Sequence, residues 1–247
     1  GRETSYGVLD SHASQVANGI IAAGVGPQAR VGYLGKNSDI YFELLFGAAK
    51  ANVIVVGINW RLAPPEVEYI VADAKMEMLF VEREFFDVID KIRDSIPAVK
   101  QIVAMSGMRD SSPEFLTWRD AQEVCDPMVA IDAEDVCCQM YTSGTTGHPK
   151  GVQMTNRGFF ALRASEVRAG GWAEWEDDDV IIVPMPVFHI GGTGWAFQGF
   201  YYGAKVVILE QADPGEIINA IQTYRVTKVF VVPAVLAFML QNDLAKT

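Results

Sequence analysis

The chain has 247 residues, of which 50% are hydrophobic and 21% are charged, so it can bury a full core in one large or two small domains and is not disordered. Its formal net charge of −11 argues against a surface for nucleic acid or for an anionic membrane, because such surfaces carry clusters of Lys and Arg. The acidic balance fits a soluble protein, and we expect a cytoplasmic location.

Short β-rich apolar runs alternate with helical patterns along the chain. This alternation predicts an α/β fold in which mostly parallel sheets are flanked by helices. The expected strands cover residues 31–34, 53–58, 78–81, 101–105, 136–141, 180–183, 206–209 and 229–232.

Between the third and fourth expected strands, large apolar residues recur at spacings of four, three and four, at Phe85, Ile89, Ile92 and Ile96. This spacing puts them on one face of a helix that Pro97 ends, and we expect that face in the core. The following region, residues 107–127, has little periodicity, which predicts a mostly irregular connection.

Three cysteines, Cys125, Cys137 and Cys138, form neither a disulfide framework nor the spacing of a zinc site. The adjacent pair falls within the strand expected over 136–141. Reduced thiols in the core are therefore predicted.

The segment YTSGTTGHPKG, Tyr141–Gly151, combines the features of a phosphate-binding loop. Its glycines can adopt positive φ angles and allow close approach of the backbone, so that successive N–H groups converge on an anion. Its hydroxyls can donate to phosphate or coordinate a metal ion, and Lys150 adds a positive charge on a flexible stem. The glycines are Gly144, Gly147 and Gly151, and the hydroxyls belong to Thr142, Ser143, Thr145 and Thr146. Together they suit a nucleoside triphosphate with Mg²⁺.

A Walker A loop is the competing interpretation, and it would make the protein a P-loop NTPase or phosphotransferase. That loop requires Gly before its Lys, Ser or Thr after it, and then a helix. Here Pro149 precedes Lys150, Gly151 follows it, and residues 152–154 alternate as a strand does. A Walker A enzyme of this kind would release ADP and phosphate, so analysis of the products tests this interpretation.

The last third of the chain contains one well-specified helix start and one long apolar run. Asp213, Pro214 and Glu216 have the order of an N-cap, a first-turn proline and a capping-box acid. The run Val229–Leu240 is interrupted by Pro233 and is shorter than the roughly 20 residues that span a bilayer, so we interpret it as core.

Two segments carry a resemblance to the adenylate-forming superfamily, which includes acyl-CoA synthetases, luciferases and the adenylation domains of peptide synthetases. The first is the loop Tyr141–Gly151, and the second is VPMPVFHIGG, Val183–Gly192. By itself His189 would be read as a satisfied histidine at the end of a strand. Looser similarity extends over Gly24–Val71 and Lys228–Leu240.

The resemblance implies a fold with two packed, mostly parallel sheets and an incomplete N-terminal adenylation domain over residues 1–247. A first sheet with the phosphate loop is expected within 28–157, and a second sheet within 158–247 together with 1–27. In the family, the adenine and ribose sites and the catalytic Lys of a small C-terminal domain come later than residue 247. The fragment 1–247 alone is therefore expected to be nearly inactive.

The implied chemistry is the attack of a carboxylate on ATP, with Mg²⁺, to give an acyl-adenylate and pyrophosphate, followed by transfer to coenzyme A. The loop would hold the β- and γ-phosphates, Lys150 would add charge, and Thr145 would contact Mg²⁺. His189 would shape the carboxylate or acyl site, and with Lys150 it is the candidate catalytic residue. The wall of that site would be formed by Phe188, Gly191, Gly192, Thr193 and Trp195.

Among the branches of the superfamily, a fatty-acyl-CoA ligase is favoured. The intact TGHPKG sequence resembles the ligases, and the apolar neighbourhood of residues 187–200 suits an alkyl chain. An aryl-CoA ligase, a fatty-acyl-AMP ligase and a non-catalytic nucleotide- or acyl-binding module stay open as alternatives. The expected partners are a small carboxylic acid, ATP and coenzyme A, with no nucleic acid, while chain length, peripheral membrane contact and oligomeric state are left open.

Overall fold

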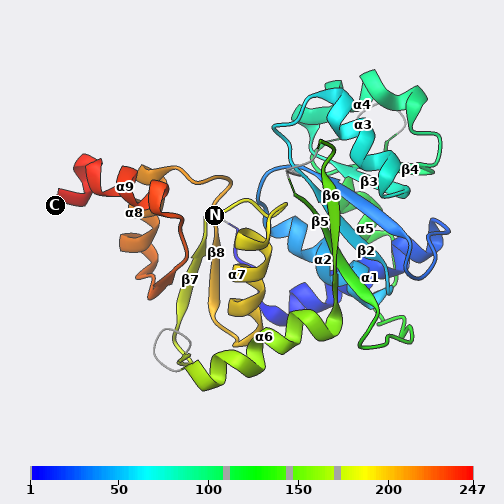
Figure 1. Ribbon diagram of the computed structural model, residues 1–247. Coiled ribbons are helices and arrows are strands. Elements are labelled where there is room, and N and C mark those ends of the chain that lie inside the picture. Colours follow the sequence, from blue (N-terminus) through cyan, green and yellow to red (C-terminus); the bar gives the residue numbers. More distant parts are fainter. Residues whose placement is uncertain (1, 108–111, 143–146, 170–173, 247) are drawn as a thin grey trace. The chain divides into compact units, whose positions relative to one another are not determined.

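The computed structural model describes residues 2–107, 112–142, 147–169 and 174–246 (Figure 1). The chain divides into two compact units. Unit 1 comprises Gly1–Gly35 and Asp39–Arg157, and unit 2 comprises Lys36–Ser38 and Gly158–Thr247.

Unit 1 is built on a six-stranded sheet with the order β4-β3-β1-β2-β5-β6. The strands pair in parallel except for β6, which runs antiparallel to β5. Their bounds are β1 Arg30–Leu34, β2 Ile54–Ile58, β3 Met76–Val81, β4 Gln101–Ala104, β5 Val136–Thr142 and β6 Lys150–Thr155. The expected mostly parallel α/β sheet is confirmed, and residues 152–154 lie in a strand as their alternation predicted.

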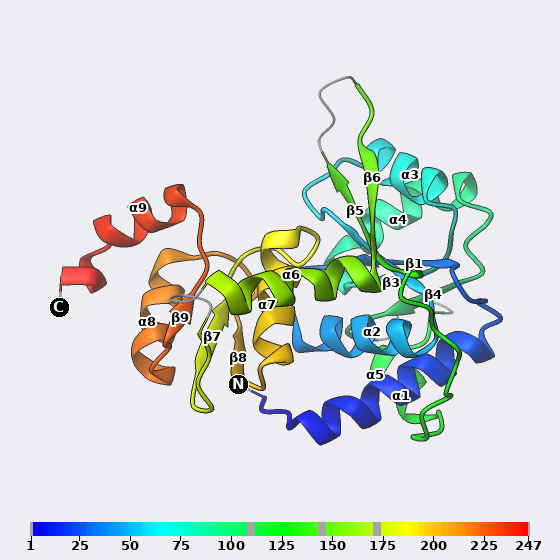
Figure 2. The same ribbon diagram turned by 60° about the horizontal axis from the view of Figure 1, so that its bottom comes forward.

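Helices cover both faces of this sheet. They are α1 Tyr6–Ala22, α2 Asp39–Lys50, α3 Pro64–Asp73, α4 Phe86–Ile92 and α5 Phe115–Asp120, with 3₁₀ turns η1 Arg83–Phe85 and η2 Arg93–Ser95. Figure 2 shows α3 and α4 on one side of the sheet and α1, α2 and α5 on the other. This arrangement buries both faces, as parallel sheets require.

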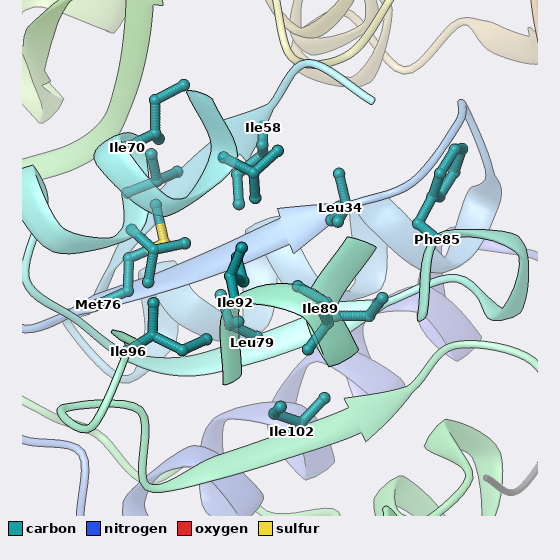
Figure 3. Close-up of a cluster of buried hydrophobic side chains, with 14 of the residues drawn as sticks. Leu34, Ile58, Ile70, Met76, Leu79, Phe85, Ile89, Ile92, Ile96 and Ile102 are labelled. Carbon is teal, nitrogen blue, oxygen red and sulfur yellow. The ribbon is translucent and has the colours of Figure 1, made fainter. Parts of the chain in front are cut away.

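The predicted apolar stripe packs into the core between α3, α4 and the sheet (Figure 3). Ile89 and Ile92 are 0% and 2% exposed and belong to the same cluster as Ile70 of α3 and Leu79 of β3. Burying one such side chain contributes about 1.5–3 kcal/mol to folding. The prediction for this face is confirmed, although α-helical geometry is limited to Phe86–Ile92, with a 3₁₀ turn on each side.

The region expected to be mostly irregular contains a short helix, α5. The side chain of Glu114 caps it by accepting a hydrogen bond from the Thr117 N–H at 3.0 Å. Phe115 and Trp118 are buried against Phe80, with ring centroids 6.1 and 5.5 Å from that ring. A helix of six residues is too short to show a period, so packing rather than local pattern defines it.

Residues 1–27 belong to unit 1, whereas the expected division grouped them with the second sheet. The reason is close packing of α1 on its neighbours. A Cβ added to Gly47 of α2 would lie 2.6 Å from Val16 Cβ, and one added to Gly19 would lie 2.5 Å from the Trp118 ring. These glycines allow the helices to approach closely, which buries the inner face of α1 in unit 1.

The cysteines are free thiols, and the two that lie in a strand of the sheet are more buried than the third. Cys138 is fully buried in β5, Cys137 is partly buried and Cys125 is exposed. Burial raises the pKa of Cys137 to about 11 and raises that of Cys138 as well, so both stay protonated at neutral pH.

Unit 2 contains a parallel sheet with the order β8-β7-β9 among the residues described. Its elements are α6 Asn156–Ala169, β7 Val180–Val183, α7 Ile190–Tyr201, β8 Lys205–Ile208, α8 Pro214–Tyr224, β9 Lys228–Val229, α9 Pro233–Gln241 and η4 Asp243–Lys246. The helix start at α8 is confirmed, because Asp213 Oδ1 accepts a hydrogen bond from the Glu216 N–H at 2.9 Å. β9 is shorter than expected, since Val232 already caps α9. Across the described ranges, no helix combines the length and the apolarity needed to traverse a bilayer.

Candidate functional site

The predicted phosphate loop connects the two antiparallel strands β5 and β6 of unit 1. Thr142 pairs with Lys150 at the end of this hairpin, so both ends of the loop leave the sheet at one place. Thr142, Gly147 and Lys150 are exposed there. Four of the predicted phosphate ligands, Ser143, Gly144, Thr145 and Thr146, lie outside the described residues.

Two glycines of the loop serve different purposes. Gly147 has φ +116°, a backbone conformation that side chains other than glycine rarely adopt. Gly151 lies in β6, where an added Cβ would come within 2.4 Å of Gln139 Nε2. Gly151 therefore leaves room for the end of the Gln139 side chain, and its φ angle is not positive.

Both ends of the loop contact one face of α3. Tyr69 stacks on the His148 ring with centroids 4.7 Å apart, and its hydroxyl donates to the Pro149 carbonyl at 3.3 Å. On the other strand, the Tyr141 hydroxyl donates to the Asp73 carboxylate. Tyr69 and Asp73 are one helical turn apart, so a single face of α3 contacts both strands. We refer to Tyr69 and Asp73 as the α3 clamp.

The protonation of Tyr141 supports this description of the clamp. Burial raises the pKa of Tyr141, and the neighbouring carboxylate of Asp73 raises it further. The hydroxyl consequently remains a hydrogen-bond donor at neutral pH. The sequence held no signal for the clamp, because its partners lie 68 and 80 residues apart along the chain.

In unit 2, the second predicted segment leads from β7 to the start of α7. His189 is the N-cap of α7 and is exposed, and its Nδ1 atom accepts a hydrogen bond from the Gly191 N–H at 3.0 Å. Because Nδ1 acts as the acceptor, the proton of the neutral ring resides on Nε2. His189 can therefore offer one N–H donor to an anionic or carbonyl oxygen.

The other predicted wall residues divide into supporting and accessible positions. Thr193 is fully buried and its hydroxyl donates to the Val187 carbonyl at 2.6 Å, while the Trp195 indole donates to the Ile182 carbonyl at 2.9 Å. Gly192 is buried as well, whereas Phe188 and Gly191 are partly exposed beside His189. Thr193 and Trp195 therefore stabilise the segment, because their side-chain donors bond backbone carbonyls rather than face a substrate.

Phe230 is a further candidate wall residue that the sequence reasoning missed. Its Cε1 atom would lie 3.2 Å from a Cβ added to Gly191, and its ring centroid is 6.0 Å from that of Trp195. It is 43% exposed, although the apolar run 229–240 was interpreted as core. An apolar residue near a substrate and one in the core carry the same signal in a sequence.

Metal binding by protein side chains alone has no support in the described ranges, where no group of three or more His, Cys, Asp or Glu residues could hold an ion. An ion held largely by phosphate oxygens, with one hydroxyl of the loop, does not need such a group. The predicted Mg²⁺ contact, Thr145, lies in the part of the loop that the structure does not describe.

This chain joins two antiparallel strands of a mostly parallel sheet by a glycine- and hydroxyl-rich segment, and a strand follows its lysine. This arrangement sets it apart from the Walker A proteins, in which a helix follows the lysine. The chain belongs to the AMP-binding enzyme family, which matches residues 1–247. The resemblance to adenylate-forming enzymes is confirmed.

Curated relatives match nearly the whole chain. A fatty acid–[acyl-carrier-protein] ligase, ScoC of Streptomyces coeruleorubidus, is 38% identical over 97% of this chain and 45% of its own length. An indoleacetate–CoA ligase of Aromatoleum aromaticum is 34% identical over 97% of this chain and 46% of its length. The chain thus spans about half the length of these relatives.

Solved structures agree with the fold. The anthranilate CoA ligase AuaEII, in complex with anthranoyl-AMP, superposes with a TM-score of 0.90 at 28% identity, covering 98% of this chain and 48% of that one. The N-terminal domain of FACL13 from Mycobacterium tuberculosis gives a TM-score of 0.87 at 29% identity, covering 98% and 59%.

Proposed function

We propose that the protein containing this chain activates a carboxylic acid with ATP, releasing pyrophosphate, and then transfers the acyl group from the acyl-adenylate to a thiol. The observation that carries this proposal is the β5–β6 hairpin, which pairs Thr142 with Lys150 at the two ends of a glycine- and hydroxyl-rich loop. The family to which the chain belongs supports the same reaction.

In the proposed reaction, the residues of this chain bind and orient the reactants. N–H groups and hydroxyls of the loop 142–147 hold the β- and γ-phosphates, and Lys150 offsets the charge that develops on the leaving pyrophosphate. Mg²⁺ would be held by phosphate oxygens with the hydroxyl of Thr145, where it supplies further charge neutralisation. The substrate carboxylate attacks the α-phosphorus itself, so the reaction needs no nucleophile from the protein.

The carboxylate site is proposed at the start of α7. The Nε2–H of His189 would donate to an oxygen of the substrate, while Phe188 and Phe230 would provide apolar surface for its organic group. A fatty acid is the first candidate substrate and an aryl acid the second. Coenzyme A is the first candidate acceptor, and an acyl-carrier protein is the second, because the relative with 38% identity is named for that acceptor.

The Walker A alternative is not favoured. Lys150 begins strand β6, which pairs antiparallel with β5 over Lys150–Thr155. A Walker A lysine begins a helix whose N-terminus faces the phosphates. A strand in that place presents no helix dipole to an anion.

The proposed reaction is tested by carboxylate-dependent exchange of pyrophosphate into ATP by the full-length protein, across fatty, aryl and amino acids. Lys150→Ala should lower kcat/KM for ATP by about 10- to 100-fold, the effect of losing one hydrogen bond to a charged group worth about 1.5–3 kcal/mol. Lys91→Ala, on the exposed surface of α4, is the matched control and should leave the exchange unchanged. ATP hydrolysis to ADP without acid-dependent exchange would contradict the proposal.

The α3 clamp leads to a second prediction. Tyr69→Leu removes both the stacking on His148 and the hydrogen bond to Pro149, so the end of the loop loses its support. We expect KM for ATP in the exchange assay to rise about tenfold, since misplacing reacting groups by 1 Å can cost about a hundredfold. Tyr69→Phe keeps the ring and should stay within about fivefold of the parent, because one neutral hydrogen bond contributes only about 1 kcal/mol. An equal rise of KM for ATP and for the acid would rule out a specific role at the loop.

A further inference from the structure

The amide of Asn37 is buried and fully hydrogen-bonded within unit 2. Asn37 is 5% exposed, and its Nδ2 atom donates to the carbonyls of Met185 and Leu209, each at 3.0 Å. Its Oδ1 atom accepts from the Val187 N–H at 2.9 Å. One side chain thus uses both donors and its acceptor on the backbone that follows β7 and β8.

The segment after β7 needs such a partner because of its composition. Pro184 and Pro186 have no N–H groups, so residues 184–187 cannot continue the regular ladder of the sheet. The N–H of Val187 and the carbonyl of Met185 are bonded by Asn37 instead. Without this amide they would lose these partners in a buried region, which is unfavourable because little water is there to replace the lost hydrogen bonds.

The segment that Asn37 holds also determines where His189 lies. Both backbone polar groups of Val187 are bonded, since its N–H donates to Asn37 and its carbonyl accepts from Thr193 of α7. The first turn of α7 rests directly on the same segment, where a Cβ on Gly192 would lie 2.3 Å from the Pro186 carbonyl oxygen. A shift of residues 185–187 would therefore carry the N-cap of α7 with it.

We propose that Asn37 is a positioning residue for the carboxylate site, acting through residues 185–187 on His189. This inference rests on the proposed function for its kinetic consequences, but its structural consequence can be measured separately. These hydrogen bonds require an asparagine side chain at position 37. An aspartate would direct carboxylate oxygens at the carbonyls of Met185 and Leu209, and a glutamine is one methylene too long for the same bonds.

The kinetic test is a double-mutant cycle in the full-length protein. Asn37→Ala should raise KM for the carboxylate about tenfold and leave KM for ATP within about twofold, because only the acid site is displaced. In a His189→Ala background, the same change should raise KM for the acid less than about twofold, since the residue through which Asn37 acts is gone. Additive effects of the two changes, or an equal rise of KM for ATP, would overturn the proposal.

Thr227→Val is the matched control for a loss of stability without displacement of His189. Thr227 lies at the opposite end of β7, where its hydroxyl donates to Asp179 Oδ1 at 2.6 Å and accepts from the Val180 N–H at 3.0 Å. We expect this variant to lower Tm without changing KM for the acid. Asn37→Ser, which leaves a smaller gap, replaces Asn37→Ala if the latter does not fold.

A readout independent of activity is hydrogen–deuterium exchange of peptides covering residues 184–192. Asn37→Ala or Asn37→Ser should speed the exchange of the Val187 and Gly191 amides about tenfold, whereas Thr227→Val should not. Unchanged exchange in this segment would refute the positioning role. Faster exchange in a protein that shows no acid-dependent pyrophosphate exchange would refute the proposed function and leave the positioning of His189 standing.

Discussion

Gly192→Ala is expected to displace the first turn of α7 and to abolish acid-dependent pyrophosphate exchange. The added Cβ would lie 2.3 Å from the Pro186 carbonyl oxygen and 2.4 Å from that of Met185. Both obstacles are backbone atoms, so no side-chain rotation can relieve the clash, and we expect a loss of about 3 kcal/mol or more in the free energy of unfolding. Urea unfolding followed by tryptophan fluorescence measures the loss, because Trp195 lies in the same helix.

Gly194→Ala is the matched control for this prediction, since it makes the same chemical change two residues further along α7. Its Cβ would meet only the Ile190 side chain, at 3.0 Å from Cδ1, which can rotate away. Alanine is favoured over glycine inside a helix by about 1 kcal/mol, so this variant should be neutral or more stable. Equal stability of the two variants would show that the contact of α7 with residues 185–186 is not close in solution.

Glu43→Ala is expected to destabilise unit 1 by about 3 kcal/mol, because it removes the buried partner of the Arg119 guanidinium and leaves only Asp120, whose side chain is 58% exposed. Glu43 is 1% exposed, and its carboxylate accepts from Arg119 Nη1 at 2.6 Å and contacts His12 Nδ1 at 3.0 Å. Burial tends to lower the pKa of Arg119, but hydrogen bonds and charges of Glu43 and Asp120 outweigh it and raise the pKa. A guanidinium has an intrinsic pKa far above neutral pH, so Arg119 stays charged when Glu43 is removed. Chemical denaturation of the parent and the variant at neutral pH gives the difference.

Two further variants show whether the burial of this ion pair, rather than its charge alone, causes the effect. Asp39→Asn removes the exposed partner of Arg2, in a pair whose side chains are 43% and 38% exposed, and should cost less than about 1 kcal/mol. Replacing Glu43 and Arg119 together by Met should cost less than Glu43→Ala, because no uncompensated charge remains. A loss below 1 kcal/mol for Glu43→Ala would contradict the expectation.

The features that could be predicted from the sequence are those with a local cause. The stripe on α4 repeats at the helical period, Asp213 caps a helix that begins at the next residue, and residues 152–154 alternate as a strand. The family resemblance likewise came from two short segments, 141–151 and 183–192. Each of these signals lies within about a dozen neighbouring residues, where the backbone period and the side-chain chemistry can be read together.

The sequence by itself determined the α/β class, the strands on either side of the predicted phosphate loop and the segment that carries His189. Only the tertiary structure decided what supports them, through the bonds of Asn37 to Met185, of Tyr69 to Pro149 and of Arg119 to Glu43, which span 148, 80 and 76 residues. The physical reason is that these polar contacts depend on which segments the sheets bring side by side, and a single polar residue carries no period that marks its distant partner.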